Sequence, residues 1–273
     1  MLNLDDISAQ HHTLSIRLAP DGFSFFVLNV KEHKVIAFKH SHIELHQDAV
    51  VVALNALRSE EVFSYPFERV QVLIDFPAVT TVPSSLYSED KIEELFGLNI
   101  DAGLNEYVLS NHSSAYDLEV LFSIPKELYT FFNKNFPKIN FIHKLSTVLN
   151  DANAYENKAQ EQLFISYTEH HFTAVALRNN SLIYHNCFNL NSPEDLVYYF
   201  LLVYQELGFD QYQANVLIDG IIEEGSKELD IVREYIKHIS FAKLHQDYIY
   251  PETVKAEPEH YYSNLFTLPY CAS

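Results

Sequence analysis

Glycine is scarce in this sequence, which has six glycines among 273 residues. No two of them are adjacent, and neither a GxGxxG pattern nor a GxxxxGK pattern followed by serine or threonine occurs. The glycine-rich loops that usually cradle phosphate groups are therefore missing.

Cysteine is also rare, with Cys187 and Cys271 alone. Two cysteines are too few for a disulfide framework and show no metal-ligand spacing, so we expect reduced thiols. The acidic start of the sequence lacks the basic and apolar pattern of a signal peptide. No apolar run reaches the ~18 residues of a membrane span. The sequence therefore predicts a cytoplasmic protein without direct membrane insertion.

Basic residues are outnumbered, because 18 lysines and arginines stand against 37 acidic residues, for a formal net charge of −19. Such a surface does not attract phosphate backbones as a whole, so we expect no nucleic-acid partner. Hydrophobic residues still make up 48% of the chain, which is a globular composition. At about 100–200 residues per domain, the length allows one large domain or two modest ones.

The first half of the sequence predicts three strands, a helix and a fourth strand. Ala19-Pro20-Asp21-Gly22 supplies turn chemistry between the first two strands, which therefore form a hairpin. Asp48 is a suitable N-cap for the helix, whose apolar residues recur at helical spacing. In order, the predicted elements cover residues 14–18, 23–30, 35–45, 49–58 and 70–74.

The second half repeats this order of elements. Ser192-Pro193-Glu194-Asp195 is a strong helix start, and Gly208 ends that helix. The last strand of each run closes on the same tetrapeptide, Val72-Leu73-Ile74-Asp75 in one half and Val216-Leu217-Ile218-Asp219 in the other. The shared order and spacing predict an internal duplication. The repeated elements cover residues 163–167, 172–177, 182–188, 193–207 and 216–219.

Further segments lie between and after these runs. Thr80-Thr81-Val82-Pro83 leads into a predicted acidic helix over 89–96, whose charges indicate a solvated face. The tail over 248–273 is rich in proline and tyrosine, and we expect it to pack across the body of the protein. The other predicted elements are a hairpin of 107–111 and 116–124, helices over 125–132, 147–160 and 228–238, and strands over 139–143 and 239–244.

Two tandem copies of this pattern resemble the actin-like ATPase fold, a duplicated ribonuclease-H-like fold. The segment from Thr81 to Ser88 and the acidic helix look like the inserted subdomain of the cell-division protein FtsA and the pilus-assembly protein PilM. Val120-Leu121-Phe122-Ser123-Ile124-Pro125-Lys126-Glu127 looks like the strand-to-helix return of those proteins. The sequence is identified as a member of an uncharacterised bacterial family with this fold.

This resemblance implies an α/β protein with two mixed five-stranded sheets, helices and a small inserted α+β subdomain. Residues 1–158 would form the first half, with the insert at about 77–124. Residues 159–273 would form the second half with its C-terminal tail.

The departures from the ATP-binding pattern bear most on function. Relatives that bind ATP carry Asp-x-Gly in both hairpins, but the first strand here presents Arg17, and the second hairpin reads Tyr167-Thr168-Glu169-His170-His171. The adenosine motif is replaced by Asp219-Gly220, with Glu223 and Glu224 close behind. Negative charges there oppose a nucleotide. We therefore expect no ATP hydrolysis and no cofactor.

Alternatives remain for the residues of the interdomain cleft. In an active ATPase or a kinase of this superfamily the cleft would be open, ATP with Mg²⁺ would be the cofactor, and the lining residues would be Arg17, Asp75, Glu169, Asp219 and Gly220. Arg17 would then bind an anion, whereas the plainer interpretation is a structural ion pair with Asp75. A metal-dependent nuclease or hydrolase is the third interpretation, but Asp75 and Asp219 lie in different halves and no converging metal ligands are visible.

The leading interpretation is a non-catalytic, pseudo-ATPase scaffold of actin-like fold that binds another protein. In proteins with this insert, the insert and the neighbouring first half contact partners, so residues of about 77–124 are the expected interaction site. A partner segment would add to a sheet edge or lie in a groove there. This interpretation predicts that side chains fill the interdomain cleft.

Overall fold

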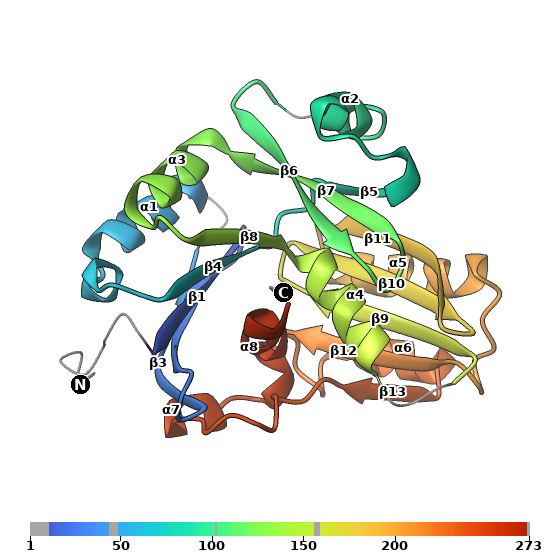
Figure 1. Ribbon diagram of the computed structural model, residues 1–273. Helices are drawn as coiled ribbons and strands as arrows, with labels where there is room; N and C mark the ends of the chain where they lie inside the picture. The colour runs from blue at the N-terminus through green and yellow to red at the C-terminus, as the bar shows by residue number, and fades with distance from the viewer. Residues whose placement is uncertain (1–10, 44–48, 102, 156–158, 272–273) are drawn as a thin grey trace.

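Two five-stranded mixed sheets form the body of the protein in a computed structural model that describes residues 11–43, 49–101, 103–155 and 159–271 (Figure 1). The first sheet has the order β3-β2-β1-β4-β8, in which β1, β2 and β3 are antiparallel and β4 and β8 run parallel to β1. Its strands are β1 (His12–Ala19), β2 (Gly22–Asn29), β3 (Lys34–His42), β4 (Arg69–Ile74) and β8 (Ile139–His143).

The second sheet repeats the first, with the order β11-β10-β9-β12-β13. β12 lies parallel between β9 and β13, as β4 lies between β1 and β8. The sequence prediction of a strand–strand–strand–helix–strand repeat is therefore confirmed. The strands are β9 (Glu161–Tyr167), β10 (His171–Arg178), β11 (Ser181–Asn189), β12 (Asn215–Gly220) and β13 (His238–Phe241).

Helices cover the outer face of each sheet. On the first sheet they are α1 (Ala49–Ser59) and α3 (Lys126–Asn135), which close a core of apolar strand residues. On the second they are α5 (Pro193–Glu206) and α6 (Lys227–Tyr235). α5 begins at the predicted start, where Ser192 and Asp195 form a capping box, and Gly208 follows its end with a φ of 63°.

Helices α4 and α8 lie between the sheets, each against the sheet of the other half (Figure 1). α4 (Lys144–Ala154) follows the first sheet but packs with Leu145 and Leu149 on β9 and β10 of the second. α8 (Ser263–Thr267) follows the second sheet, and its Phe266 packs on Phe26 of the first, with ring centroids 4.7 Å apart. The tail, which includes the short helix α7 (Glu252–Lys255), crosses the body as predicted.

The insert forms a third, three-stranded sheet of order β5-β7-β6 with the short helix α2 on one side (Figure 1). Its elements are β5 (Val79–Pro83), α2 (Ile92–Gly97), β6 (Glu106–Ser113) and β7 (Leu118–Pro125). The sequence prediction missed β5, because its partner β7 is distant in the sequence and the segment was interpreted only as a lead into the helix.

Helix α4 corrects the predicted 147–160 helix. It begins three residues earlier because the side chain of His143 caps it, accepting a hydrogen bond from the backbone N–H of Leu145. It ends at Ala154. The predicted Asp48 cap and the end of the predicted 35–45 strand lie outside the described residues. Within the part of the chain that the structure describes, no helix is long and apolar enough to cross a membrane.

Candidate functional site

The carboxyl ends of β4 and β12 meet between the two sheets and bring the predicted site residues Arg17, Asp75 and Asp219 together. Each comes from the end of a central strand or its neighbour, where the chain leaves the sheet. The three residues are 6%, 2% and 9% exposed, so the side chains expected to line an open cleft are buried. Glu169 lies at the margin, with 53% of its side chain exposed.

Arg17 forms a buried ion pair with two carboxylates. Its Nε donates to Asp75 Oδ2 at 2.9 Å, and its Nη2 donates to Asp21 Oδ1 at 3.1 Å. Burial acts to lower the pKa of Arg17, but Asp21 and Asp75 outweigh it and raise that pKa. Asp21 lies in the predicted turn, yet its carboxylate also accepts from the backbone N–H of Glu169 at 3.4 Å. The turn residue therefore joins the two halves.

Asp75 has two further partners that the sequence did not indicate. His171 Nε2 lies 3.1 Å from Asp75 Oδ1, and Lys144 Nζ lies 3.6 Å from Asp75 Oδ2. Burial alone would raise the pKa of Asp75, but Lys144, Arg17 and His171 hold it well below its usual range. The sequence pattern Glu169-His170-His171 predicts a polar turn, but in the structure His171 begins β10 and is 1% exposed.

Asp219 receives the other contact of Lys144, whose Nζ lies 3.7 Å from Asp219 Oδ1. The hydroxyl of Ser166 donates to the same oxygen. Burial raises the pKa of Asp219, although Lys144 and Ser166 act to lower it. The one lysine therefore contacts the carboxylates that end the two equivalent tetrapeptides.

Gly220 serves backbone packing. It has a φ of 99°, and a Cβ added to it would lie 1.9 Å from the carbonyl oxygen of Tyr167 on β9. Side chains other than hydrogen do not fit at that distance. Gly220 therefore lets β12 leave the sheet directly against β9.

The carboxylates of the cleft do not fit a magnesium ion in this arrangement. Mg²⁺ takes oxygen ligands, but the ammonium of Lys144 already lies beside both candidate carboxylates, Asp75 and Asp219, and would repel a metal ion. Among the residues that the structure describes, no group of three His, Cys, Asp or Glu side chains converges as a metal site.

His143 makes the stability of the folded protein depend on pH. Its Nε2 donates to the carbonyl oxygen of Phe76 at 2.9 Å, and its Nδ1 accepts from Leu145, so the folded protein requires the neutral ring. Burial lowers the pKa of His143 to about 4 from 6.5. Between these values the unfolded chain binds the proton more tightly. The stability that His143 contributes is therefore present above about pH 6.5 and is lost as the pH falls to about 4.

We expect the stability advantage of the natural protein over a His143→Gln variant to shrink by roughly 3 kcal/mol across that interval. Denaturant unfolding of both proteins at several pH values measures it. Asp151, whose pKa is raised to about 8 by burial, titrates in the opposite sense but is common to both proteins and cancels. A difference that does not change with pH would contradict the assignment.

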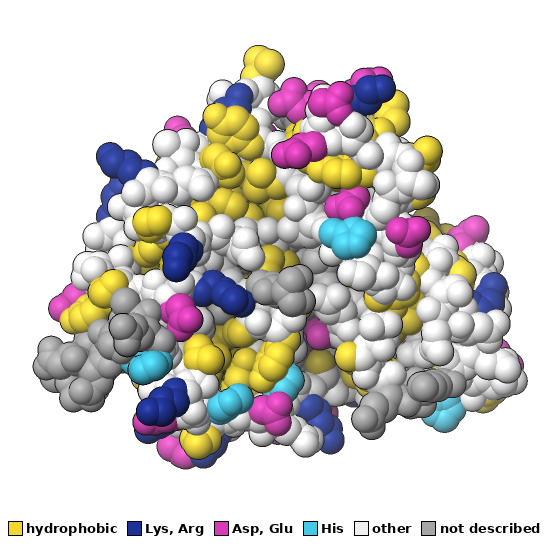
Figure 2. All heavy atoms as spheres, viewed as in Figure 1, with side chains coloured by type: hydrophobic (Ala, Val, Ile, Leu, Met, Phe, Trp, Pro, Cys, Tyr) yellow, Lys and Arg dark blue, Asp and Glu magenta, His cyan; other side chains and the backbone are white. Residues whose placement is uncertain are grey.

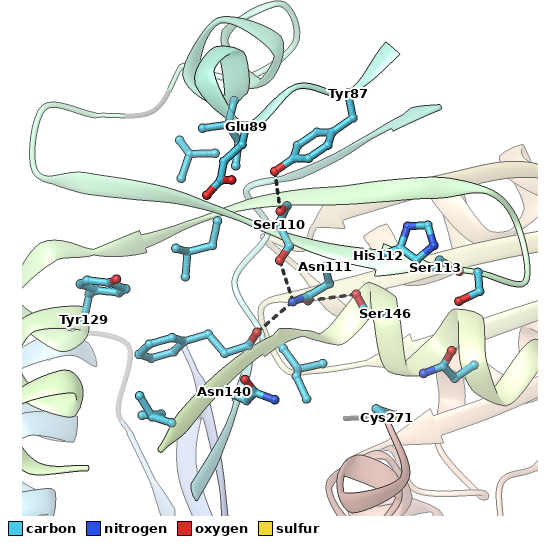
Figure 3. A pocket seen from close by; sticks show the side chains of 18 of the residues that line it. Tyr87, Glu89, Ser110, Asn111, His112, Ser113, Tyr129, Asn140, Ser146 and Cys271 are labelled. Carbon is cyan, nitrogen blue, oxygen red and sulfur yellow. Dashed lines mark hydrogen bonds between the residues drawn. The ribbon is translucent and has the colours of Figure 1, made fainter. Parts of the chain in front are cut away.

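A second feature is a groove of about 750 Å³ between the insert and the first sheet (Figure 3). β6 is an edge strand of the small sheet and β8 is an edge strand of the first sheet, and both border the groove. Asn111 on β6 joins them, because its Nδ2 donates to the carbonyl oxygen of Phe141 at 2.9 Å and its Oδ1 accepts from the backbone of His143 at 2.8 Å. Tyr87, whose hydroxyl is 2.9 Å from Ser110 Oγ, lies above this junction.

The insert beside this groove is strongly acidic. Residues 77–124 contain eight acidic residues and one lysine, a net charge of −7. Figure 2 shows acidic side chains gathered over the helical part of the insert, at the top of the view. Glu89 lines the groove itself (Figure 3). The groove therefore lies in a negative field that attracts cations and basic side chains.

Comparison with solved structures identifies the architecture. A Bacteroides thetaiotaomicron protein described as having an actin-like ATPase fold and unknown function matches with a TM-score of 0.78 and 22% identity, over 89% of this chain and 94% of that one. PilM, in a type IV pilus biogenesis complex of PilM and PilN, matches with a TM-score of 0.59 and 8% identity, over 94% and 97% of the two chains. These matches confirm the predicted fold class and the similarity to PilM.

Comparison of sequences gives one family. The family model described as "Protein of unknown function (DUF3822)" matches residues 3–239. No curated protein matches the sequence.

Proposed function

The chain belongs to the DUF3822 family, and from that premise we propose that it is a non-catalytic protein of actin-like ATPase fold. We propose further that it binds another protein through residues 77–124. The observation that carries this proposal is the groove between two strand edges, β6 and β8, at the base of the insert. Edge strands offer backbone donors and acceptors to an added segment.

The paired side chains of the cleft support the non-catalytic part of the proposal. Arg17 and Lys144 neutralise the carboxylates at the ends of β4 and β12, so these carboxylates are not available to a metal ion. The alternative, a nucleotide-binding ATPase or kinase, requires these ion pairs to break when ATP enters.

PilM supports the partner-binding part, because a protein of the same fold was solved in a complex with another protein, PilN. The charge of the insert adds the chemistry of the partner. We infer an extended segment with lysine or arginine side chains, since a net charge of −7 favours basic sequences and the strand edges favour an extended backbone.

Selection from a library of random displayed peptides tests this role directly. We expect peptides that alternate apolar residues with lysine or arginine, and we expect their binding to weaken as salt is added. An Asn140→Trp variant places a large ring in the groove, which Asn140 lines (Figure 3), and should abolish binding. Asn191→Trp, at another exposed position, is the matched control and should bind normally. If peptides bind the Asn140→Trp variant as well as they bind the natural protein, their binding site lies outside the groove.

Calorimetric titration with ATP and Mg²⁺ separates the two functional interpretations. The proposal predicts no heat of binding and no change in melting temperature at millimolar ATP. Micromolar binding, lost in an Asp219→Ala variant, would instead support the nucleotide-binding alternative.

A further inference from the structure

The ammonium of Lys144 lies between two carboxylates that are equivalent by duplication. Asp75 ends the Val72-Leu73-Ile74-Asp75 tetrapeptide of the first sheet, and Asp219 ends the same tetrapeptide of the second. Lys144 Nζ is 3.6 Å from one and 3.7 Å from the other, so it is shared almost equally between the two halves. The lysine side chain is 4% exposed, and its neighbours therefore determine its charge environment.

The distances from Lys144 Nζ to the two carboxylates are typical of ion pairs and too long for hydrogen bonds. Nitrogen–oxygen hydrogen bonds span about 2.7–3.2 Å, and both contacts of Lys144 are longer. Each carboxylate already has shorter contacts, from Arg17 Nε and His171 Nε2 to Asp75 and from Ser166 to Asp219. Lys144 therefore interacts with the two carboxylates mainly through its positive charge and little through hydrogen bonds. A bound cation would interact with them in the same way.

We propose that Asp75 and Asp219 form a single cation site between the two halves, and that the Lys144 ammonium is its resident cation. Within the described residues, Lys144 is the one cationic side chain in ion-pair contact with both aspartates. The site closes the cleft without metal or nucleotide, because the chain carries its own counter-ion on the first residue of α4. An emptied site would accept a small divalent cation with oxygen ligands, such as Mg²⁺, Mn²⁺ or Ca²⁺.

A Lys144→Ala variant tests the proposal, because it removes the ammonium and leaves both carboxylates. We expect its melting temperature to fall, and we expect millimolar MgCl₂, MnCl₂ or CaCl₂ to restore several degrees compared with NaCl of equal ionic strength. The natural protein should show no such gain. Lys255→Ala, which removes an exposed lysine paired with Glu252, is the matched control and should behave as the natural protein does.

The double variant Lys144→Ala/Asp219→Asn decides the matter if the single variant does not fold. Removing one of the two charges removes the need for a cation, so the double variant should be more stable than Lys144→Ala and should not respond to divalent cations. A double variant no more stable than the single one would overturn the proposal. So would a Lys144→Ala protein whose response to divalent cations equals that of the natural protein.

Discussion

Replacing Asp75 by asparagine should lower the free energy of unfolding by about 3–5 kcal/mol, which is typical when one partner of a buried ion pair is removed. The variant keeps the shape of the side chain but removes the charge that Arg17, Lys144 and His171 share. Two cationic groups then remain buried beside a neutral amide. Chemical denaturation of the variant and the natural protein measures the loss.

Asp230→Asn is the control for this experiment. Asp230 pairs with Arg233 at 3.3 Å, but 66% of its side chain is exposed to solvent. Exposed ion pairs contribute little, so the change should stay within about 0.5 kcal/mol. If the two variants lost the same stability, the cluster around Asp75 would not be holding the halves together.

Gly220→Ala is the second change with a large expected effect. The new methyl group would lie 1.9 Å from the carbonyl oxygen of Tyr167, and the φ of 99° is strained for any L side chain. Strand β12 has to move away from β9, at a cost of about 3 kcal/mol or more. For a chain of this size, that corresponds to a fall in melting temperature of roughly 6–12 °C.

Gly225→Ala provides a close comparison, since an added Cβ at Gly225 meets no atom within 4 Å. We expect that variant to melt within a degree or two of the natural protein. Scanning calorimetry on the pair separates the steric requirement of Gly220 from a general effect of losing a glycine. Equal melting temperatures for the two variants would show that β12 can relax without cost.

The repeated core of the fold was predictable from local sequence. Alternating and apolar segments gave β1, β2, β9 and β10, and the capping box at Ser192 gave the start of α5. These signals lie within a few residues of each other, so no knowledge of distant partners is needed. β5 was missed because its stability comes from pairing with β7, which no local pattern encodes.

The site was predictable only in part, for the same reason. Arg17 stood out because it lies on the first strand, near the turn where ATP-binding relatives carry Asp-x-Gly, and its pairing with Asp75 was the plainer interpretation. No local sequence pattern identifies Lys144 or His171 as part of the site. One lies where a strand turns into a helix, and the other follows an ordinary polar turn. The approach of the two halves brings Lys144 to Asp219 and His171 to Asp75.

The exchange of inner helices between the halves has a consequence for synthesis on the ribosome. Phe26 and Leu73 of the first sheet need the tail, with Phe266 and Leu268, to complete their apolar cluster. The ribosome makes these strands long before it makes that tail. The inner face of the first sheet therefore lacks its packing partners, and is exposed or bound by a chaperone, until the second half has been translated. The first half therefore completes its folding only after the second half has been translated, so the two halves fold as one cooperative unit.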